Sequence, residues 1–160
     1  MIRCGVITVS DKGYRGERQD LSIDAIRSSV TGLGEVIDYK LVPDEMQVIT
    51  EALVKMCTKD LDIIFTTGGT GLSPRDITPE ATQAVIERSV PGIPEAMRSI
   101  SMKHTNRAML SRAIAGIRGN TLIINLPGSP KAAKECILGI ADVLPHAVET
   151  LSGHSGDCAR

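Results

Sequence analysis

The stretch TTGGTGLSPRDITPEAT, residues 66–82, holds the residues best suited to chemistry. Because Gly68, Gly69 and Gly71 have no Cβ, the backbone N–H groups of this segment can approach an anion closely. An apolar run precedes the glycines and a helix start follows them, which is the order found in phosphate sites. The segment is neither a G-x-x-x-x-G-K-S/T loop nor a G-x-G-x-x-G dinucleotide fingerprint. Taken alone, a phosphate cradle and an ordinary glycine-rich turn remain equally open.

Two carboxylates near expected strand ends, Asp44 and Asp76, could hold a metal ion. Magnesium takes one or two carboxylates and completes its shell with water and phosphate oxygens. Each residue also has a structural interpretation: Asp44 as the N-cap of a helix, and Asp76 as the partner of a neighbouring arginine. Lys131 could contact a phosphate as a point charge. By itself, however, Lys131 is more simply interpreted as an exposed lysine in a first helical turn.

These side chains can act together only if the fold brings them to one place. Short apolar runs closed by turn residues predict strands, and apolar residues three or four apart predict helices between them. This alternation implies a three-layer α/β/α sandwich with a mostly parallel, Rossmann-like sheet. The segment 112–120 can pair with the last strand across a Gly119-Asn120 turn, which would give an antiparallel edge strand. The expected strands are 2–9, 36–42, 61–67 and 120–128. Two helices are expected at 20–31 and 46–56, and two more begin at Thr78, as a capping residue, and after Pro94. A last helix is expected from Pro130 to Leu151, with a bend at Pro145.

In open α/β sheets, ligands bind beyond the carboxyl ends of the strands. Polar and glycine residues follow every expected strand, so one edge of the sheet should collect them. These residues are Ser10, Asp11, Gly13 and Gly16 after the first strand, Asp44 after the second, Gly68, Gly69, Thr70, Gly71, Arg75 and Asp76 after the third, and Pro127, Gly128, Ser129 and Lys131 after the fourth.

Composition narrows the class of protein. A chain of 160 residues is most simply one domain, 1–160, with a sizeable core. Its 18 basic residues against 19 acidic ones argue against nucleic acid as a partner. No apolar run approaches the length of a membrane span or a signal segment, so a cytoplasmic protein without a membrane partner is expected. With one Phe, two Tyr and no Trp, a heterocyclic ligand would rest on aliphatic walls and backbone groups.

The cysteines and histidines offer little for chemistry. The four cysteines are far apart and form no C-x-x-C pair, so neither a disulfide framework nor a zinc site is expected. His154 and Cys158 stand four apart and leave a minor possibility of a metal clip. No Ser-His-Asp or Cys-His arrangement is visible, and the histidines are interpreted as structural or surface residues.

The string TTGGTGLSPRDITPEAT resembles the signature of the molybdenum cofactor biosynthesis family of bacterial MoaB and Mog proteins. The G domains of plant Cnx and animal gephyrin belong to the same family. The likeness extends to VSDKGYRGERQD, LVPDE and INLPGSPKA, and so covers nearly the whole chain. One departure is Ser22-Ile23, at the start of the first long helix, where family members often carry glycine.

The resemblance implies that Asp44 and Asp76 are the functionally important acids of the site, with Mg²⁺ as the metal ion. It also implies a wall of binding residues around molybdopterin and nucleotide. These residues are Ser10, Asp11 and Gly16 of the first loop, Thr67, Gly68, Gly69, Thr70 and Gly71 of the glycine loop, and Pro127, Gly128, Ser129 and Lys131 of the last loop.

The family's reaction transfers AMP from ATP to the terminal phosphate of molybdopterin and releases pyrophosphate. The resemblance further implies a homotrimer and hand-over of the product to a molybdenum-insertion protein. Two alternatives stay open from the sequence. The chain could bind molybdopterin without transferring AMP, or it could be a fold relative, like the competence-damage-inducible proteins, that acts on another nucleotide.

Overall fold

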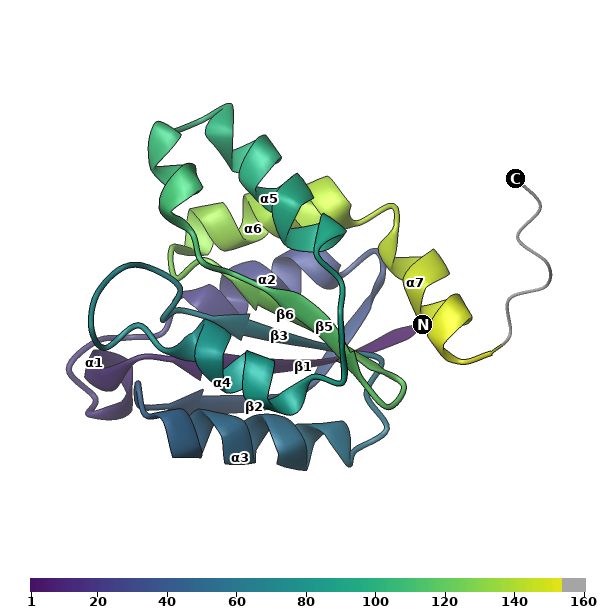
Figure 1. Ribbon diagram of the computed structural model, residues 1–160, viewed down its shortest axis with the longest axis horizontal. Coiled ribbons are helices and arrows are strands. Elements are labelled where there is room, and N and C mark those ends of the chain that lie inside the picture. The colour runs from purple at the N-terminus through teal and green to yellow at the C-terminus, as the bar shows by residue number, and fades with distance from the viewer. Residues whose placement is uncertain (154–160) are drawn as a thin grey trace.

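A six-stranded, mostly parallel sheet forms the centre of the protein, seen in a computed structural model that describes residues 1–153 (Figure 1). Its strand order is β2-β1-β3-β6-β5-β4. The pairs from β2 to β6 are parallel, whereas β5 pairs antiparallel with both β6 and β4. The strands are β1 (Ile2–Val9), β2 (Gly34–Val42), β3 (Ile63–Thr67), β4 (Arg88–Ser89), β5 (Ala115–Arg118) and β6 (Thr121–Leu126).

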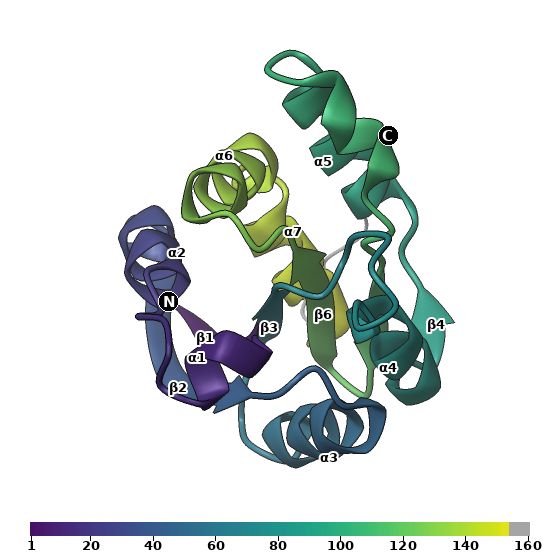
Figure 2. The same ribbon diagram turned by 90° about the vertical axis from the view of Figure 1, so that its left-hand side faces the viewer.

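Helices cover both faces of the sheet, which confirms the expected three-layer sandwich with an antiparallel edge (Figures 1 and 2). One face carries α2 (Ser22–Val30), α5 (Gly92–Met102) and α6 (Pro130–Ile140), and the other carries α3 (Met46–Cys57) and α4 (Thr78–Val85). The remaining elements are the short α1 (Asp11–Tyr14), the 3₁₀ helix η1 (Asn106–Leu110) and α7 (Leu144–Leu151).

Two aliphatic cores lie on the two faces of the sheet. Every residue of β3 and β6 is buried, as expected for strands covered on both sides. Ile23 of α2 is 9% exposed and packs into one of these cores. In the middle of the other layer, the buried Asn125 side-chain amide donates to Thr66 Oγ1 (2.9 Å) and Thr82 Oγ1 (2.8 Å). This polar bridge ties β6 to β3 and α4, and so fixes the strand that leads into the glycine loop.

Three details of the expected elements are wrong. The C-terminal segment is two helices, because α6 ends at Ile140 and α7 begins at Leu144, with Pro145 in its first turn. Proline lacks the N–H that would continue a helix but fits a first turn well, so it begins α7 instead of bending one long helix. The first loop contains the short helix α1, capped by Ser10, which accepts from the Gly13 N–H at 3.1 Å. The third and last strands are also shorter than expected.

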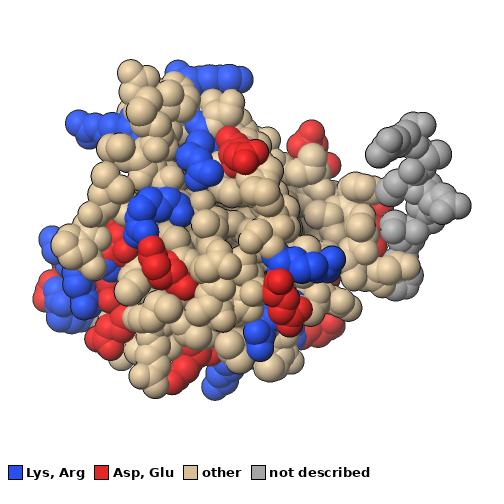
Figure 3. All heavy atoms as spheres, in the orientation of Figure 1, with Lys and Arg blue, Asp and Glu red and all other residues tan. Residues whose placement is uncertain are grey.

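On the face seen in Figure 3, acidic and basic side chains are interspersed. Within residues 1–153, no helix is long and apolar enough to cross a membrane. The His154–Cys158 pair lies outside the described residues. The cysteines within them, Cys4, Cys57 and Cys136, form no disulfide with one another.

Candidate functional site

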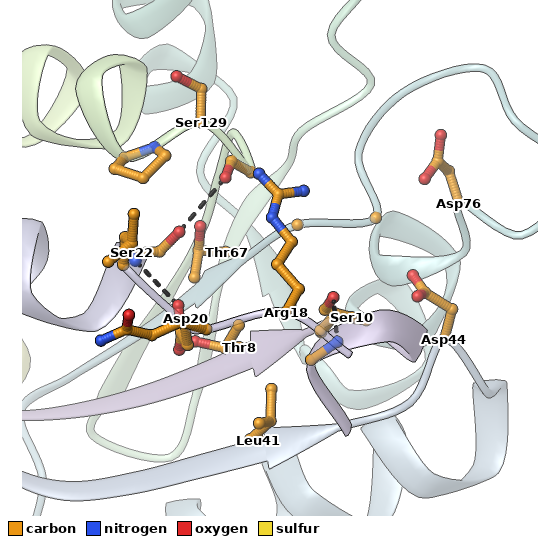
Figure 4. Close-up of a pocket in the computed structure, with 18 residues that line it drawn as sticks. Thr8, Ser10, Arg18, Asp20, Ser22, Leu41, Asp44, Thr67, Asp76 and Ser129 are labelled. Atoms are coloured by element: carbon orange, nitrogen blue, oxygen red, sulfur yellow. Dashed lines mark hydrogen bonds between the residues drawn. The ribbon is translucent and has the colours of Figure 1, made fainter. Parts of the chain in front are cut away.

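A cavity of about 510 Å³ opens beyond the carboxyl ends of β1 and β3, at the edge of the sheet that faces the viewer in Figure 2. Figure 4 shows how its walls are arranged, with Asp20 and Ser22 on one side, Asp44 and Asp76 on the other, and Arg18 between them. It is lined by Thr8, Val9, Ser10, Gly13, Arg18, Gln19, Asp20, Leu21, Ser22, Leu41, Asp44, Thr67, Gly68, Gly69, Asp76, Gly128, Ser129 and Pro130.

The glycine loop turns sharply after β3. Gly68 and Gly69 have φ angles of 94° and 66°. Residues with a Cβ rarely adopt such positive φ angles, whereas glycine does so readily. A Cβ at Gly68 would overlap the carbonyl oxygen of Val9, and one at Gly69 would overlap the hydroxyl of Thr78. Thr78 does not cap α4 as expected; its hydroxyl donates to the Gly68 carbonyl at 2.9 Å, and its N–H donates to the Gly69 carbonyl at 3.1 Å. The loop is therefore fixed against the start of α4, and Gly68 and Gly69 line the cavity.

Arg112 braces the outer part of the glycine loop. Its guanidinium donates to the carbonyl oxygens of Gly71 (2.7 Å) and Asp76 (2.6 Å) and pairs with Glu80. The Arg112 N–H also donates to the Thr70 carbonyl at 2.9 Å. The hydrogen bond with this guanidinium lowers the pKa of Glu80. One arginine from a distant segment thus holds the backbone on both sides of the loop, and sequence reasoning missed it because 36 positions separate Arg112 from Asp76.

Asp11 and Asp44 join the first two loops by a reciprocal pair of hydrogen bonds. The Asp11 N–H donates to Asp44 Oδ2 at 2.8 Å, and the Asp44 N–H donates to Asp11 Oδ1 at 3.0 Å. Asp11 also receives both a 3.0 Å and a 2.9 Å hydrogen bond from the guanidinium of Arg75, which lowers the pKa of Asp11. Asp44 therefore does not cap α3; Glu45 occupies that position without a side-chain hydrogen bond.

Burial raises the pKa of Asp44, and the negative charges of Asp11 and Asp76 raise it further. The Asp76 carboxylate accepts a 2.9 Å hydrogen bond from the Ser73 N–H, and it has no arginine partner in the described part of the chain because Arg75 pairs with Asp11. Two carboxylates that repel each other across a cavity form a favourable environment for a divalent cation. No group of three or more candidate ligands occurs within residues 1–153. A pair of this kind fits Mg²⁺, which keeps much of its shell for water and phosphate oxygens.

Eight of the fourteen residues expected to form the site line the cavity. They are Ser10, Asp44, Thr67, Gly68, Gly69, Asp76, Gly128 and Ser129. Ser129 also caps α6, and Thr67 Oγ1 donates to the Pro127 carbonyl at 2.8 Å, which joins the glycine loop to the last loop.

The other six expected residues lie outside the cavity lining. Asp11 stands at the loop junction paired with Arg75, and Gly16 is in an exposed turn with φ 74°. Lys131 is 84% exposed and stands 4.0 Å from Glu135, so its role as a phosphate contact stays a prediction. Thr70, Gly71 and Pro127 line a second, more apolar hollow of about 250 Å³ between α5, η1 and α6.

Sequence reasoning missed several residues that line the cavity, chiefly Thr8, Arg18 and Ser22. Arg18 is the one Lys or Arg in the described lining and has no ion pair there. Its neighbour Arg15 is paired with Glu17 at 2.7 Å. The sequence signal that could have revealed them is Arg18-Gln19-Asp20, a polar run in the irregular segment between α1 and α2. All three of these residues line the cavity.

Comparisons with known proteins agree with this geometry. The family described as a probable molybdopterin binding domain matches residues 5–146. A molybdopterin adenylyltransferase from Helicobacter pylori is 42% identical, over 96% of this chain and 89% of its own. A second one, from Escherichia coli, is 35% identical, over 95% of this chain and 86% of its own. The crystal structure of the molybdopterin biosynthesis enzyme MoaB from Thermus thermophilus has a TM-score of 0.90 and 52% identity, covering 96% of this chain and 98% of that one. The chain therefore belongs to the MoaB/Mog family of molybdenum cofactor biosynthesis proteins.

Proposed function

We propose that this protein is a molybdopterin adenylyltransferase, which joins AMP from ATP to the terminal phosphate of molybdopterin. The observation that carries the proposal is the meeting of a bare glycine loop with Asp44 and Asp76 in one cavity. The curated relatives of this name match nearly the full chain, which supports transfer over simple binding.

The chemistry asks for few titrating groups. A phosphate monoester is anionic at neutral pH, so its oxygen attacks the α-phosphorus of ATP without a general base. The new bond joins that oxygen to the α-phosphorus, and the bond from the α-phosphorus to the bridging oxygen breaks to release pyrophosphate. Most of the barrier comes from aligning two polyanions and stabilising the charge on the leaving group. Alignment alone can supply about 7–11 kcal/mol.

The residues of this chain divide that task. The Arg18 guanidinium makes no ion pair among the described residues, so it would donate hydrogen bonds to phosphate oxygens, as would backbone N–H groups of the glycine loop. Asp44 and Asp76 would hold Mg²⁺, which neutralises phosphate charge when bound. The hydrogen bonds from Arg112 and Thr78 hold the loop in place before substrate arrives.

The test is an incubation of purified protein with molybdopterin and Mg-ATP, followed by chromatography for adenylylated molybdopterin and pyrophosphate. Product is expected with the wild type, and Asp76→Asn should form it at least roughly 100-fold more slowly. Binding of molybdopterin in calorimetry without any product would instead support a non-catalytic carrier. Binding of other nucleotides with no affinity for pterins would support a fold relative with another substrate.

The proposal includes the wider setting of the family. The enzyme would act in the cytoplasm as a homotrimer and pass its product to a molybdenum-insertion protein. Exposed Leu72, Met109 and Leu110 lie on or beside the apolar hollow and offer a surface for another copy of the chain. Light scattering at several concentrations would measure the assembly, and a monomer throughout would contradict the trimer.

A further inference from the structure

Gly71, the last glycine of the glycine loop, lies against the carboxylate of Asp76. A Cβ on Gly71 would stand 2.8 Å from Asp76 Oδ2 and 3.7 Å from Asp76 Cγ, and it would meet no other heavy atom within 4 Å outside its chain neighbours. Unlike Gly68 and Gly69, Gly71 does not have a positive φ, so its backbone conformation is open to alanine. The missing side chain therefore leaves room for one group only, the Asp76 carboxylate.

The Asp76 carboxylate is held through one of its two oxygens. Oδ2, the oxygen on the Gly71 side, accepts from the Ser73 N–H at 2.9 Å, and the Asp76 N–H donates back to the Ser73 carbonyl at 2.9 Å. Within residues 1–153, Oδ1 accepts no hydrogen bond. Asp76 lines the cavity, and its negative charge raises the pKa of Asp44. The short turn from Gly71 to Asp76 thus fixes Oδ2 and leaves Oδ1 available to a bound group.

Arg112 joins the two ends of this turn. Its Nε donates to the Gly71 carbonyl at 2.7 Å, and a terminal nitrogen donates to the Asp76 carbonyl at 2.6 Å. Glu80 of α4 pairs with the same guanidinium and fixes its direction. A planar guanidinium can hold two carbonyl oxygens in one geometry, whereas a lysine ammonium is a point charge on a flexible stem. Neither Gly71 nor Arg112 lines the cavity, so an influence of either on a bound ligand passes through Asp76.

We propose that Gly71 and Arg112 are positioning residues that fix the Asp76 carboxylate for adenylyl transfer. Gly71 acts by having no Cβ where Oδ2 lies, and Arg112 acts by holding the turn closed. Gly71 serves the site through Asp76, without contacting molybdopterin or nucleotide. This assignment rests on the proposed function, since it concerns a carboxylate that would hold Mg²⁺, and it adds why the third glycine of the loop is needed.

The first test uses no substrate. In Gly71→Ala the new Cβ must displace the Asp76 carboxylate, because a side-chain end moves more readily than backbone. The hydrogen bond from the Ser73 N–H to Oδ2 should weaken, so NMR spectra should show the Ser73 amide proton shifted upfield, toward its position in Asp76→Ala. Gly32→Ala, whose Cβ meets nothing within 4 Å, is the matched control and should leave that resonance unchanged. A wild-type Ser73 resonance in Gly71→Ala would overturn the assignment.

Kinetics connect the displacement with the reaction. Gly71→Ala should lower kcat about 10- to 30-fold while the KM for molybdopterin changes less than about twofold, because a displaced carboxylate loses its alignment with the reacting phosphates. The melting temperature should stay within about 2 °C of wild type, since the Cβ meets only a movable side-chain end. A wild-type kcat, or a rise in KM as large as the loss of kcat, would contradict the positioning role.

A double-mutant cycle separates positioning of Asp76 from other effects of the alanine. In the Asp76→Asn background, Gly71→Ala should lower kcat less than about twofold, because the carboxylate that it displaces is already absent. An equal loss of kcat in both backgrounds would show that Gly71 acts independently of Asp76 and would defeat the proposal.

Arg112→Lys tests the second positioning residue. It keeps a positive charge beside Glu80 but not the paired hydrogen bonds, so kcat should fall about three- to tenfold and the Ser73 amide proton should again shift upfield. Arg118→Lys is the matched control, because Arg118 donates to the Val85 carbonyl, and it should keep both wild-type values. An unmoved Ser73 resonance with wild-type kcat would remove Arg112 from the assignment. If the wild type forms no adenylylated molybdopterin, the enzyme proposal fails, and the substrate-free NMR comparison still decides whether these residues position the carboxylate.

Discussion

The two sides of the cavity are built on different principles. On the glycine-loop side, Gly68 and Gly69 expose backbone, and the side chains that matter, Asp44 and Asp76, are acids fixed by backbone hydrogen bonds. On the first-loop side, no glycine with a positive φ lines the cavity within residues 1–153, and the polar groups are the side chains of Thr8, Arg18 and Asp20. The glycine-loop side is suited to bind the charged phosphate group that all phosphate esters have in common. The first-loop side is suited to recognise the chemical groups by which one ligand differs from another.

This difference predicts two kinds of kinetic defect. Changes on the glycine-loop side should lower kcat, because they alter charge and alignment at the reacting phosphates. Changes on the first-loop side should raise KM or dissociation constants with kcat nearly kept, because they remove binding shared by ground state and transition state. The following variants test that division, from the largest expected effect to the smallest.

Asp76→Asn should lower kcat roughly 100-fold or more, because the neutral amide no longer helps to hold the charge that stabilises the leaving group. Molybdopterin affinity, measured by calorimetry, should change by less than about threefold. The exposed Asp142→Asn is the matched control and should keep wild-type kcat. Turnover undiminished in Asp76→Asn would remove Asp76 from the proposed chemistry.

Gly68→Ala should reduce the free energy of unfolding by about 2–4 kcal/mol, through left-handed strain and overlap with the Val9 carbonyl. The control is Gly16→Ala, where φ is 74° but no atom stands within 4 Å of the added Cβ. This control should lose only about 1–2 kcal/mol and keep kcat. Urea denaturation with kinetics on both variants measures the contrast. If Gly16→Ala lowered kcat as much as Gly68→Ala does, Gly16 would have to be counted among the residues of the site.

Arg18→Gln should raise the KM for the phosphate-bearing substrates about tenfold with kcat little changed, because one charge-assisted hydrogen bond is lost. Lys131→Gln should change KM less than about twofold, since Lys131 is on the surface near Glu135. Initial-rate kinetics at low and moderate salt would separate the two. The opposite ranking would restore Lys131 as the phosphate contact.

The smallest effect concerns pH and stability. Because the pKa of Asp44 is raised above 3.8 in the folded protein, its favourable contribution is present below pH 3.8 and is lost as the pH rises through the folded pKa. Asp44→Asn should therefore gain stability relative to wild type as the pH rises above 3.8. Asp11 has a lowered pKa, so its contribution is present above pH 3.8 and is lost as the pH falls through the folded pKa. Asp11→Asn should accordingly show the opposite trend in denaturation series, and equal trends would refute the assignment.

The sequence predicted the fold well because the relevant signals are local. Short apolar runs bounded by glycine and proline indicated the parallel strands, and a Gly119-Asn120 turn indicated the antiparallel edge. The glycine loop was recognisable since its residues are consecutive and its conformation needs glycine. Pro145 was misjudged because a proline marks a helix interruption in sequence without showing whether a helix bends or a new one begins.

The site itself depended on contacts that no spacing reveals. Asp11 and Asp44, which are 33 positions apart, are joined by a hydrogen bond between their loops. Arg112 donates a hydrogen bond to the Gly71 carbonyl, 41 positions away in the sequence. The sequence by itself determined which residue types gather beyond the strand ends, because parallel strands bring their carboxyl ends to one edge. Only the tertiary structure decided that Arg18 faces the cavity while Lys131 faces solvent, and that Thr8 is buried without a partner. The physical reason is that the direction of a side chain in an irregular loop is set by packing and hydrogen bonds with distant segments. Such contacts, unlike those of helices and strands, leave no repeating residue pattern in the sequence.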